Sequence, residues 1–199
     1  PNTVAGSGID LPEDADASRF REKYGIKGDY LIYAGRIDPS KGCGEMFDIF
    51  AQYKRRHPGD DTKLVLLGRS AMDIPVRDDI TAVGFVSEED KFDGIKGALG
   101  LWMPSRYESL SISVLEAMAL GVPVLVNGEC DVLKGHVEKS GAGMWYASEN
   151  EGEKTLSDFL DNSDRLLMSA NARSYIDKNY RWDPVTVKVT GIIDRIAGE

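Results

Sequence analysis

Two glutamates, Glu108 and Glu116, lie eight positions apart in a segment whose composition points to chemistry. Glu116 is the only charged residue from Leu110 to Leu120, and the rest of that run is apolar enough to predict a buried helix. A buried carboxylate is costly unless hydrogen bonds or a counter-charge compensate it. Glu116 therefore needs a partner. The sequence leaves two kinds open: a polar ligand, or a backbone group or arginine inside the fold.

Cations follow the short apolar runs of the chain, although the protein as a whole has a net charge of −9. Arg36 and Lys41 follow the run at 30–34, and Arg69 follows the run at 63–67. Helix N-termini after such runs would add backbone N–H donors and the positive end of the helix dipole. This combination suits a phosphate or a diphosphate. The alternative is that Arg36 and Lys41 are ordinary exposed loop cations.

The elements that must position these residues alternate along the chain, short apolar runs with amphipathic stretches. Because parallel strands need crossover connections, this alternation predicts an α/β fold with a parallel sheet of about six strands flanked by helices. The expected strands are 30–34, 63–67, 80–83, 99–103, 123–126 and 144–147. The expected helices are 44–56, 88–98, 110–120, 132–139, 151–162, 164–178 and 184–197. Ligands bind such sheets beyond the carboxyl ends of the strands, where the charged loops lie.

Composition narrows the classes of function. A pI near 4.8 argues against a general nucleic-acid binder or a protein of anionic membrane surfaces. Cys43 and Cys130 have neither metal-ligand nor redox spacing, which favours a reduced, cytoplasmic protein. Gly42-Cys43-Gly44 lacks the third glycine of a dinucleotide fingerprint, which disfavours a dinucleotide-dependent oxidoreductase. His136 falls in a helix expected at the surface, and we assign it no chemical role.

Four motifs, in this order, resemble family 4 of the retaining GT-B glycosyltransferases. They are Gly35-Arg36-x4-Lys41-Gly42, Leu64-Val-Leu-Leu-Gly68, Val83-Gly84-Phe85-Val86 and Pro104-Ser105-x2-Glu108-x7-Glu116. Gly8-Ile9-Asp10 resembles the hinge segment of that family and Tyr180-Arg-Trp-Asp183 its tail, so the resemblance covers almost the whole chain. It implies that 19–199 is the C-terminal, donor-binding lobe, one of two Rossmann-like lobes. Residues 1–18 would be a lead-in or interlobe linker, and the N-terminal acceptor lobe would be missing.

The resemblance also implies roles for particular residues. Arg36 and Lys41 would contact the donor diphosphate, Glu108 would reach hydroxyls of the donor sugar, and these three are the expected catalytic residues. Ser109 and Leu110, at the start of a helix, would present backbone N–H groups to sugar or phosphate. Glu116 would accept hydrogen bonds from the ribose diol. The other expected donor-binding residues are Gly68, Arg69, Phe85 and Val86, the last two beside the nucleobase.

The activity implied is hexose transfer from a UDP- or GDP-linked donor, mannosyltransferase-like, with retention and without a metal or cofactor. The acceptor (a glycan, a lipid or a small molecule) and any membrane association would depend on the missing lobe. The chain alone is therefore expected to transfer little or no sugar. The alternative is a non-catalytic module that binds a nucleotide or a sugar phosphate. Ser109 and Ser111 stand where many members of the family carry glycine, which narrows the space beside the phosphates.

Overall fold

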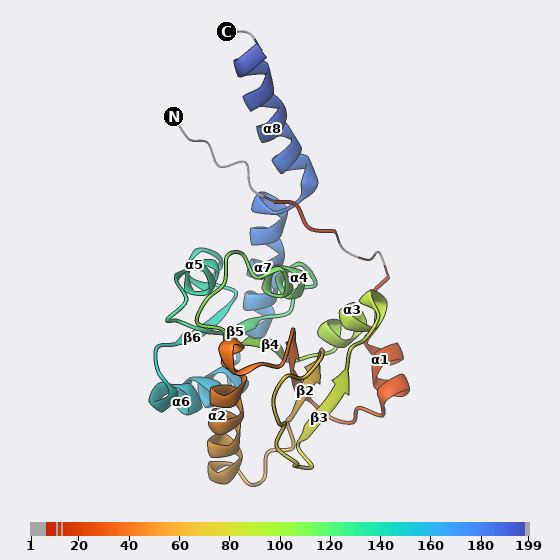
Figure 1. Cartoon of the computed structure of the whole chain (residues 1–199), viewed down its shortest axis with the longest axis vertical. Coiled ribbons are helices and arrows are strands. Elements are labelled where there is room, and N and C mark those ends of the chain that lie inside the picture. The colour runs from red at the N-terminus through yellow and green to blue at the C-terminus, as the bar shows by residue number, and fades with distance from the viewer. Residues whose placement is uncertain (1–6, 11, 13, 198–199) are drawn as a thin grey trace.

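The computed structural model describes residues 7–10, 12 and 14–197. Its centre is one sheet of six parallel strands in the order β3-β2-β1-β4-β5-β6 (Figure 1). The strands are β1 (Tyr30–Ala34), β2 (Lys63–Leu67), β3 (Ile80–Gly84), β4 (Gly100–Met103), β5 (Val124–Asn127) and β6 (Gly143–Tyr146). The predicted α/β fold with a Rossmann-like parallel sheet is confirmed.

Helices cover both faces of the sheet. Because crossovers between parallel strands are right-handed, the helix that leads outward from β1 to β2 lies opposite those that lead through β4, β5 and β6. The first face holds α2 (Cys43–Arg56), which packs against α6 (Glu149–Leu160). The second holds α3 (Glu88–Lys96), α4 (Ile112–Ala119) and α5 (Asp131–Ser140), with α1 (Ala17–Tyr24) packed on α3 and α7 (Arg165–Asn179) packed on α4 and α5.

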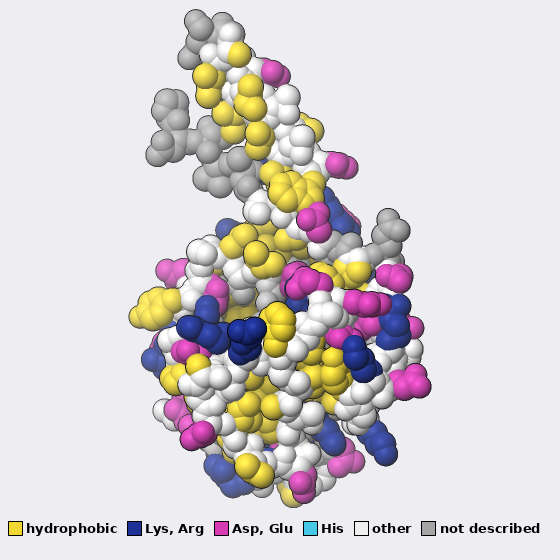
Figure 2. Space-filling view, turned by 45° about the vertical axis from the view of Figure 1, so that its right-hand side comes forward, with side chains coloured by type: hydrophobic (Ala, Val, Ile, Leu, Met, Phe, Trp, Pro, Cys, Tyr) yellow, Lys and Arg dark blue, Asp and Glu magenta, His cyan; other side chains and the backbone are white. Residues whose placement is uncertain are grey.

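The last helix, α8 (Trp182–Ala197), leaves the body of the domain and projects beyond it (Figure 1). Trp182 ties its first turn to the N-terminal segment, because the indole N–H donates to Asp10 Oδ1 over 2.7 Å. Val187, Ile193 and Ile196 of this helix are exposed, and apolar side chains mark the upper projection in Figure 2. Within the described residues, none of the helices combines the length and the apolar character needed to cross a membrane.

The core explains why the strands are continuous apolar runs. Leu31 and Ile32 of β1, and Leu101 and Trp102 of β4, are fully buried, because neighbouring side chains along a strand face opposite helix layers. Every expected element end lies within two residues of the observed one.

The sequence analysis missed α1, whose first two residues overlap the expected linker 1–18. Asp16 caps this helix by accepting a hydrogen bond from the Ser18 N–H over 2.8 Å. Only Phe20 is buried along its eight residues. A single apolar contact does not produce the periodic pattern by which a helix is found in a sequence.

Gly42, where the loop after β1 meets α2, is required by both conformation and space. Its φ is +74°, and a Cβ there would overlap the carbonyl oxygen of Pro104. Gly28 has a φ of +73°, but a Cβ there would meet nothing within 4 Å. A substitution of Gly28 is therefore a matched control that tests the conformation without the steric contact.

We expect Gly28→Ala to lower the free energy of unfolding by about 1–2 kcal/mol, the cost of a left-handed conformation. Gly42→Ala should lower it by a further 1–3 kcal/mol or so, because the added carbon overpacks the backbone. Urea denaturation of both variants measures the difference, and equal losses would show that the contact with Pro104 is unimportant.

Candidate functional site

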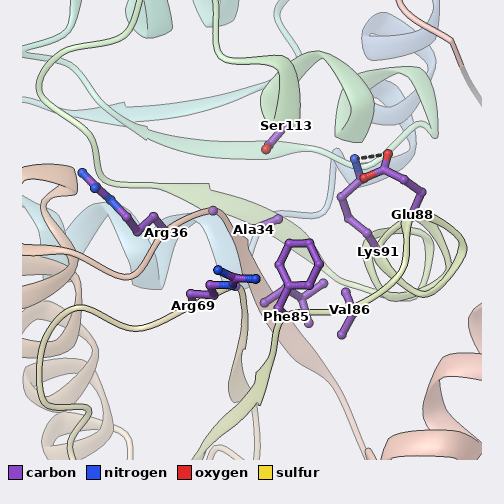
Figure 3. A pocket seen from close by; sticks show the side chains of 11 residues that line it. Ala34, Arg36, Arg69, Phe85, Val86, Glu88, Lys91 and Ser113 are labelled. Carbon is purple, nitrogen blue, oxygen red and sulfur yellow. Dashed lines mark hydrogen bonds and ion pairs between the residues drawn. The ribbon is translucent and has the colours of Figure 1, made fainter.

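The carboxyl ends of β1, β2 and β3 surround a cavity of about 330 Å³ (Figure 3). Residues expected at the donor site that line it are Arg36, Gly68, Arg69, Phe85 and Val86. Three further lining residues, which the sequence analysis did not select, are Glu88, Lys91 and Ser113. The cavity lies where the topology of a parallel sheet places ligands.

Gly68 brings two of the strand ends together. Its φ is +134°, and a Cβ would overlap the carbonyl oxygen of Gly35, which follows β1. The Gly68 N–H donates to the Gly84 carbonyl over 2.7 Å, and the Gly35 N–H donates to the Leu67 carbonyl over 2.9 Å. Gly68 therefore shapes the floor of the cavity through close backbone approach.

Arg69 and Phe85 lie side by side at the edge of the cavity (Figure 3). The Arg69 guanidinium is 5.3 Å from the centroid of the Phe85 ring, a cation–π contact. Phe85 is 77% exposed, so its ring offers a free apolar surface. Figure 2 shows basic side chains beside exposed apolar surface on one face of the body. An aromatic ring and a guanidinium at one edge can stack against a planar ligand.

The Arg36 side chain extends away from Arg69 and Phe85 (Figure 3), with its Nε 3.3 Å from Asp38 Oδ2. Its backbone is held by the buried Tyr33 hydroxyl, which donates to the Arg36 carbonyl over 2.7 Å. Burial raises the pKa of this hydroxyl, which keeps it protonated as a donor. The backbone of the loop after β1 is thus fixed, and Asp38 orients the cation at its surface.

Lys41, Glu108 and Ser109 line a second hollow, together with Arg106 and Tyr107. Lys41 Nζ lies 2.8 Å from Glu108 Oε1, so two of the three expected catalytic residues form an ion pair. The structure therefore places the expected residues at three hollows, with Arg36 in the first, Lys41 in the second and Glu116 in a third that Phe92 and Ile112 also line. A cation lines each of the first two hollows at the carboxyl edge of the sheet.

The turn before α4 differs from the expectation that Ser109 and Leu110 begin a helix. The helix starts at Ile112, and both residues lie in the preceding turn, because Ser111 has a φ of +60° that interrupts the helical path. Ser111 is the only non-glycine residue with positive φ in the described part of the chain. No described side chain caps α4, so its N-terminus retains backbone N–H donors for a ligand.

The structure shows which residue is the partner of the buried Glu116. It is 6% exposed, and its Oε1 lies 2.8 Å from Lys91 Nζ on α3. Its Oε2 is buried and has no hydrogen-bond partner among the described residues. The internal partner is therefore a lysine, and one oxygen remains for a ligand that donates hydrogen bonds. Lys91 Nζ also lies 2.8 Å from Glu88 Oε2, as the dashed line in Figure 3 marks.

The charge state of the Glu116–Lys91 pair is set by two opposed effects. Burial raises the pKa of Glu116, and the bond from Lys91 counteracts it. Burial also opposes the charge on Lys91, but its bonds to Glu116 and Glu88 outweigh this and raise its pKa. The two shifts disagree on whether the pair is ionised. The 2.8 Å separation decides for the charged pair at neutral pH, since it is the length of a charge-assisted hydrogen bond.

His136 is buried, which corrects the expectation of a surface position. Its Nε2 lies 3.0 Å from the Leu110 carbonyl oxygen and its Nδ1 lies 3.0 Å from the Tyr175 hydroxyl. Burial lowers the pKa of the imidazole. The sequence carried no signal for this contact, because Tyr175 comes from α7, far along the chain.

The strand order and the position of the cavity at the carboxyl edge define a Rossmann-like lobe. The chain belongs to the family Glycosyl transferases group 1, whose model matches residues 16–180. The resemblance to the C-terminal lobe of a GT-B glycosyltransferase is thereby confirmed.

Three similar proteins agree with this assignment. The chain is 26% identical to an uncharacterized glycosyltransferase of Methanocaldococcus jannaschii, over 87% of this chain and 47% of that protein. It is 22% identical to the GDP-mannose-dependent monoacylated alpha-(1-6)-phosphatidylinositol monomannoside mannosyltransferase of Corynebacterium glutamicum, over 94% of this chain and 54% of that protein. The crystal structure of Anabaena HepE in complex with UDP-glucose has a TM-score of 0.75 at 16% identity, covering 96% of this chain and 56% of that one. The chain thus spans about half the length of these proteins.

Lys91→Met removes the counter-charge of a buried carboxylate and keeps an apolar side chain of similar length. We expect the free energy of unfolding at pH 7 to fall by roughly 3–5 kcal/mol, as when one partner of a buried pair is removed. Lys91→Met/Glu116→Gln should recover most of this loss, because no buried charge remains. Urea denaturation measures both.

The pH dependence of these two variants distinguishes the cause. Without Lys91 the pKa of Glu116 in the folded state rises further above its unfolded value. A raised pKa favours the folded state when the carboxyl is protonated, so the deficit of Lys91→Met is largest above the folded pKa. The gap between the two variants should close as the pH falls towards about 4.3, the ordinary pKa of glutamate. A gap that is constant with pH would attribute the loss to packing.

Proposed function

We propose that this chain is the donor-binding lobe of a retaining, metal-independent hexosyltransferase of GT-B family 4 that uses a UDP- or GDP-linked sugar. The observation that carries the proposal is the buried Glu116, whose Oε2 has no partner in the described chain and whose Oε1 contacts Lys91, a residue that lines the cavity at the carboxyl edge of the sheet. A ribose diol supplies the two donors that such an oxygen accepts. The UDP-glucose complex of HepE, a protein of the same fold, supports a nucleotide-sugar ligand.

The nucleoside half of the donor fits the first hollow. The exposed ring of Phe85, backed by Arg69, can stack on a nucleobase, and Val86 extends the apolar wall. Glu116 and Lys91 would then meet the ribose below the base. This assignment accounts for the apolar lining of the hollow and for the buried acceptor that Lys91 connects to it, neither of which a phosphate alone would use.

The diphosphate half fits the cations and the end of α4. Arg36, Lys41 and the uncapped N-terminus of this helix can stabilise the negative charge that builds on the leaving nucleoside diphosphate. Glu108 Oε1 lies 2.8 Å from Lys41 Nζ, and in this position the carboxylate would reach hydroxyls of the sugar. Charge neutralisation by preorganised side chains and backbone dipoles would let transfer proceed without a metal.

The rest of the enzyme is also part of the proposal. Because the chain spans about half the length of its relatives, we assign the acceptor site and any membrane association to a second lobe. We therefore expect little or no transfer by this chain alone, and the location in the cytoplasm stays a prediction. A non-catalytic binding module is the alternative. The contact between Lys41 and Glu108 favours the enzyme, since a module without turnover needs no acid at the sugar.

Arg36→Ala and Lys41→Ala test the diphosphate site. Each should weaken UDP or GDP binding by roughly 1.5–3 kcal/mol, the contribution of a hydrogen bond to a charged group, and leave uridine or guanosine binding unchanged. Arg77→Ala is the control, since this arginine pairs with Asp79 at the opposite edge of the sheet. Isothermal titration calorimetry measures the affinities. Unchanged diphosphate affinity in both variants would refute the phosphate site.

Glu108→Gln and Glu116→Gln separate the sugar from the ribose. Glu116→Gln should weaken every ribonucleotide by about 1 kcal/mol or more, because a charged acceptor is roughly twice as strong as a neutral one. A 2′-deoxynucleotide should lose less. Glu108→Gln should weaken the intact nucleotide sugar and spare the free diphosphate. If both variants lose affinity for the same ligand alone, Glu116 is a structural acid. Turnover by the full-length protein, abolished in Glu108→Gln, distinguishes the enzyme from a binding module.

A further inference from the structure

Ser111 holds a strained conformation at the entrance to α4. Its φ of +60° and ψ of +77° lie in the left-handed region, which residues with a Cβ adopt at a cost. Such strain persists where surrounding contacts over-determine the backbone, and it concentrates at functional turns. The first turn of α4 constrains the Ser111 backbone, since the Ser111 carbonyl accepts hydrogen bonds from the N–H groups of Val114 and Leu115 over 3.1 and 3.2 Å.

A buried histidine on a different helix also constrains this turn. His136 of α5 contacts the Leu110 carbonyl oxygen with Nε2, at 3.0 Å. A carbonyl can only accept, so Nε2 carries the hydrogen and donates it. The Tyr175 hydroxyl, 3.0 Å from Nδ1, then donates to the other ring nitrogen and fixes the tautomer. Tyr175 and Tyr180 also pack edge-on against the ring, with centroids at 5.9 and 5.7 Å.

The contact with His136 also fixes the orientation of the peptide unit between Leu110 and Ser111. In a trans peptide the carbonyl and the following N–H point opposite ways. Because the Leu110 carbonyl points to the His136 ring, the Ser111 N–H points away from that ring. Within the described residues, no hydrogen bond uses that N–H. It is an unused backbone donor at the N-terminus of α4.

We propose that His136, oriented by Tyr175, is a positioning residue that keeps the turn 108–111 in its strained form and so aims the Ser111 N–H at the donor diphosphate. This inference rests on the proposed function. The histidine touches no ligand itself. It acts through the Leu110 carbonyl, which explains why a polar ring is buried between α5 and α7 at a point where an apolar residue would pack as well.

The test compares variants of His136 in two backgrounds. In the wild-type chain, His136→Leu should weaken UDP or GDP binding about tenfold and leave the corresponding nucleoside unchanged. His136→Gln keeps a donor of similar reach and should stay within about threefold. In Ser111→Gly, which adopts positive φ without strain, the turn no longer needs the clamp, so adding His136→Leu should cost threefold or less. His57→Leu is the control, because His57 ends α2 at the opposite edge of the sheet.

The outcomes separate the two proposals. If the wild-type chain binds UDP and GDP no better than the nucleosides, the proposed function fails and this inference fails with it. If the diphosphates bind but His136→Leu loses nothing, or loses as much in Ser111→Gly as in wild type, the histidine is only a packing residue. Should His136→Leu fail to fold, Tyr175→Phe and NMR decide: the variant should weaken diphosphate binding. The Ser111 amide resonance should shift with the diphosphate and not with the nucleoside, and an unmoved resonance overturns the proposal.

Discussion

The convergence of parallel strands at one edge is the constraint on which the structure depends. Every strand of the sheet points the same way, so the loops after β1, β2, β3 and β4 are forced together, however far apart they lie in the chain. The backbones of these loops approach each other most closely at two glycines. Gly68 touches the backbone of Gly35, and Gly42 touches that of Pro104. These contacts leave no room for a Cβ, and they bring Arg36, Lys41 and Glu108 to neighbouring hollows.

Charge at this edge is organised in pairs within an acidic protein. Lys41 contacts Glu108, Lys91 contacts Glu116, and Arg106 contacts both Glu45 and Glu129. Each pair holds its members in a defined orientation. The proposed donor would replace part of an existing ion pair, so the net gain on binding would be smaller than the gross attraction of cation for phosphate. Such pairing favours specificity of position over raw affinity.

The fold was predictable because it depends on patterns repeated along the chain. Continuous apolar runs such as 30–34 mark strands buried on both faces, and the cations that follow them mark the functional edge. The site was predictable only in part. The sequence showed that Glu116 needs a partner but could not name Lys91, because the pairing of α3 with α4 is a tertiary contact. It also started the helix at Leu110 rather than Ile112, since nothing in residue order reveals the positive φ of Ser111.

The first and second hollows are formed by different parts of the fold. The first is walled by strand ends, whose backbone hydrogen bonds run through the core and resist deformation. The second is bounded by the turn 108–111, which is strained and is held from outside the sheet by α5 and α7. In the proposed complex the base lies on strand ends, whereas the diphosphate also meets the turn 108–111, which His136 and Tyr175 constrain. On this proposal, a change in α7 would reach the phosphates through Tyr175, His136 and the Leu110 carbonyl, because these three groups are in contact.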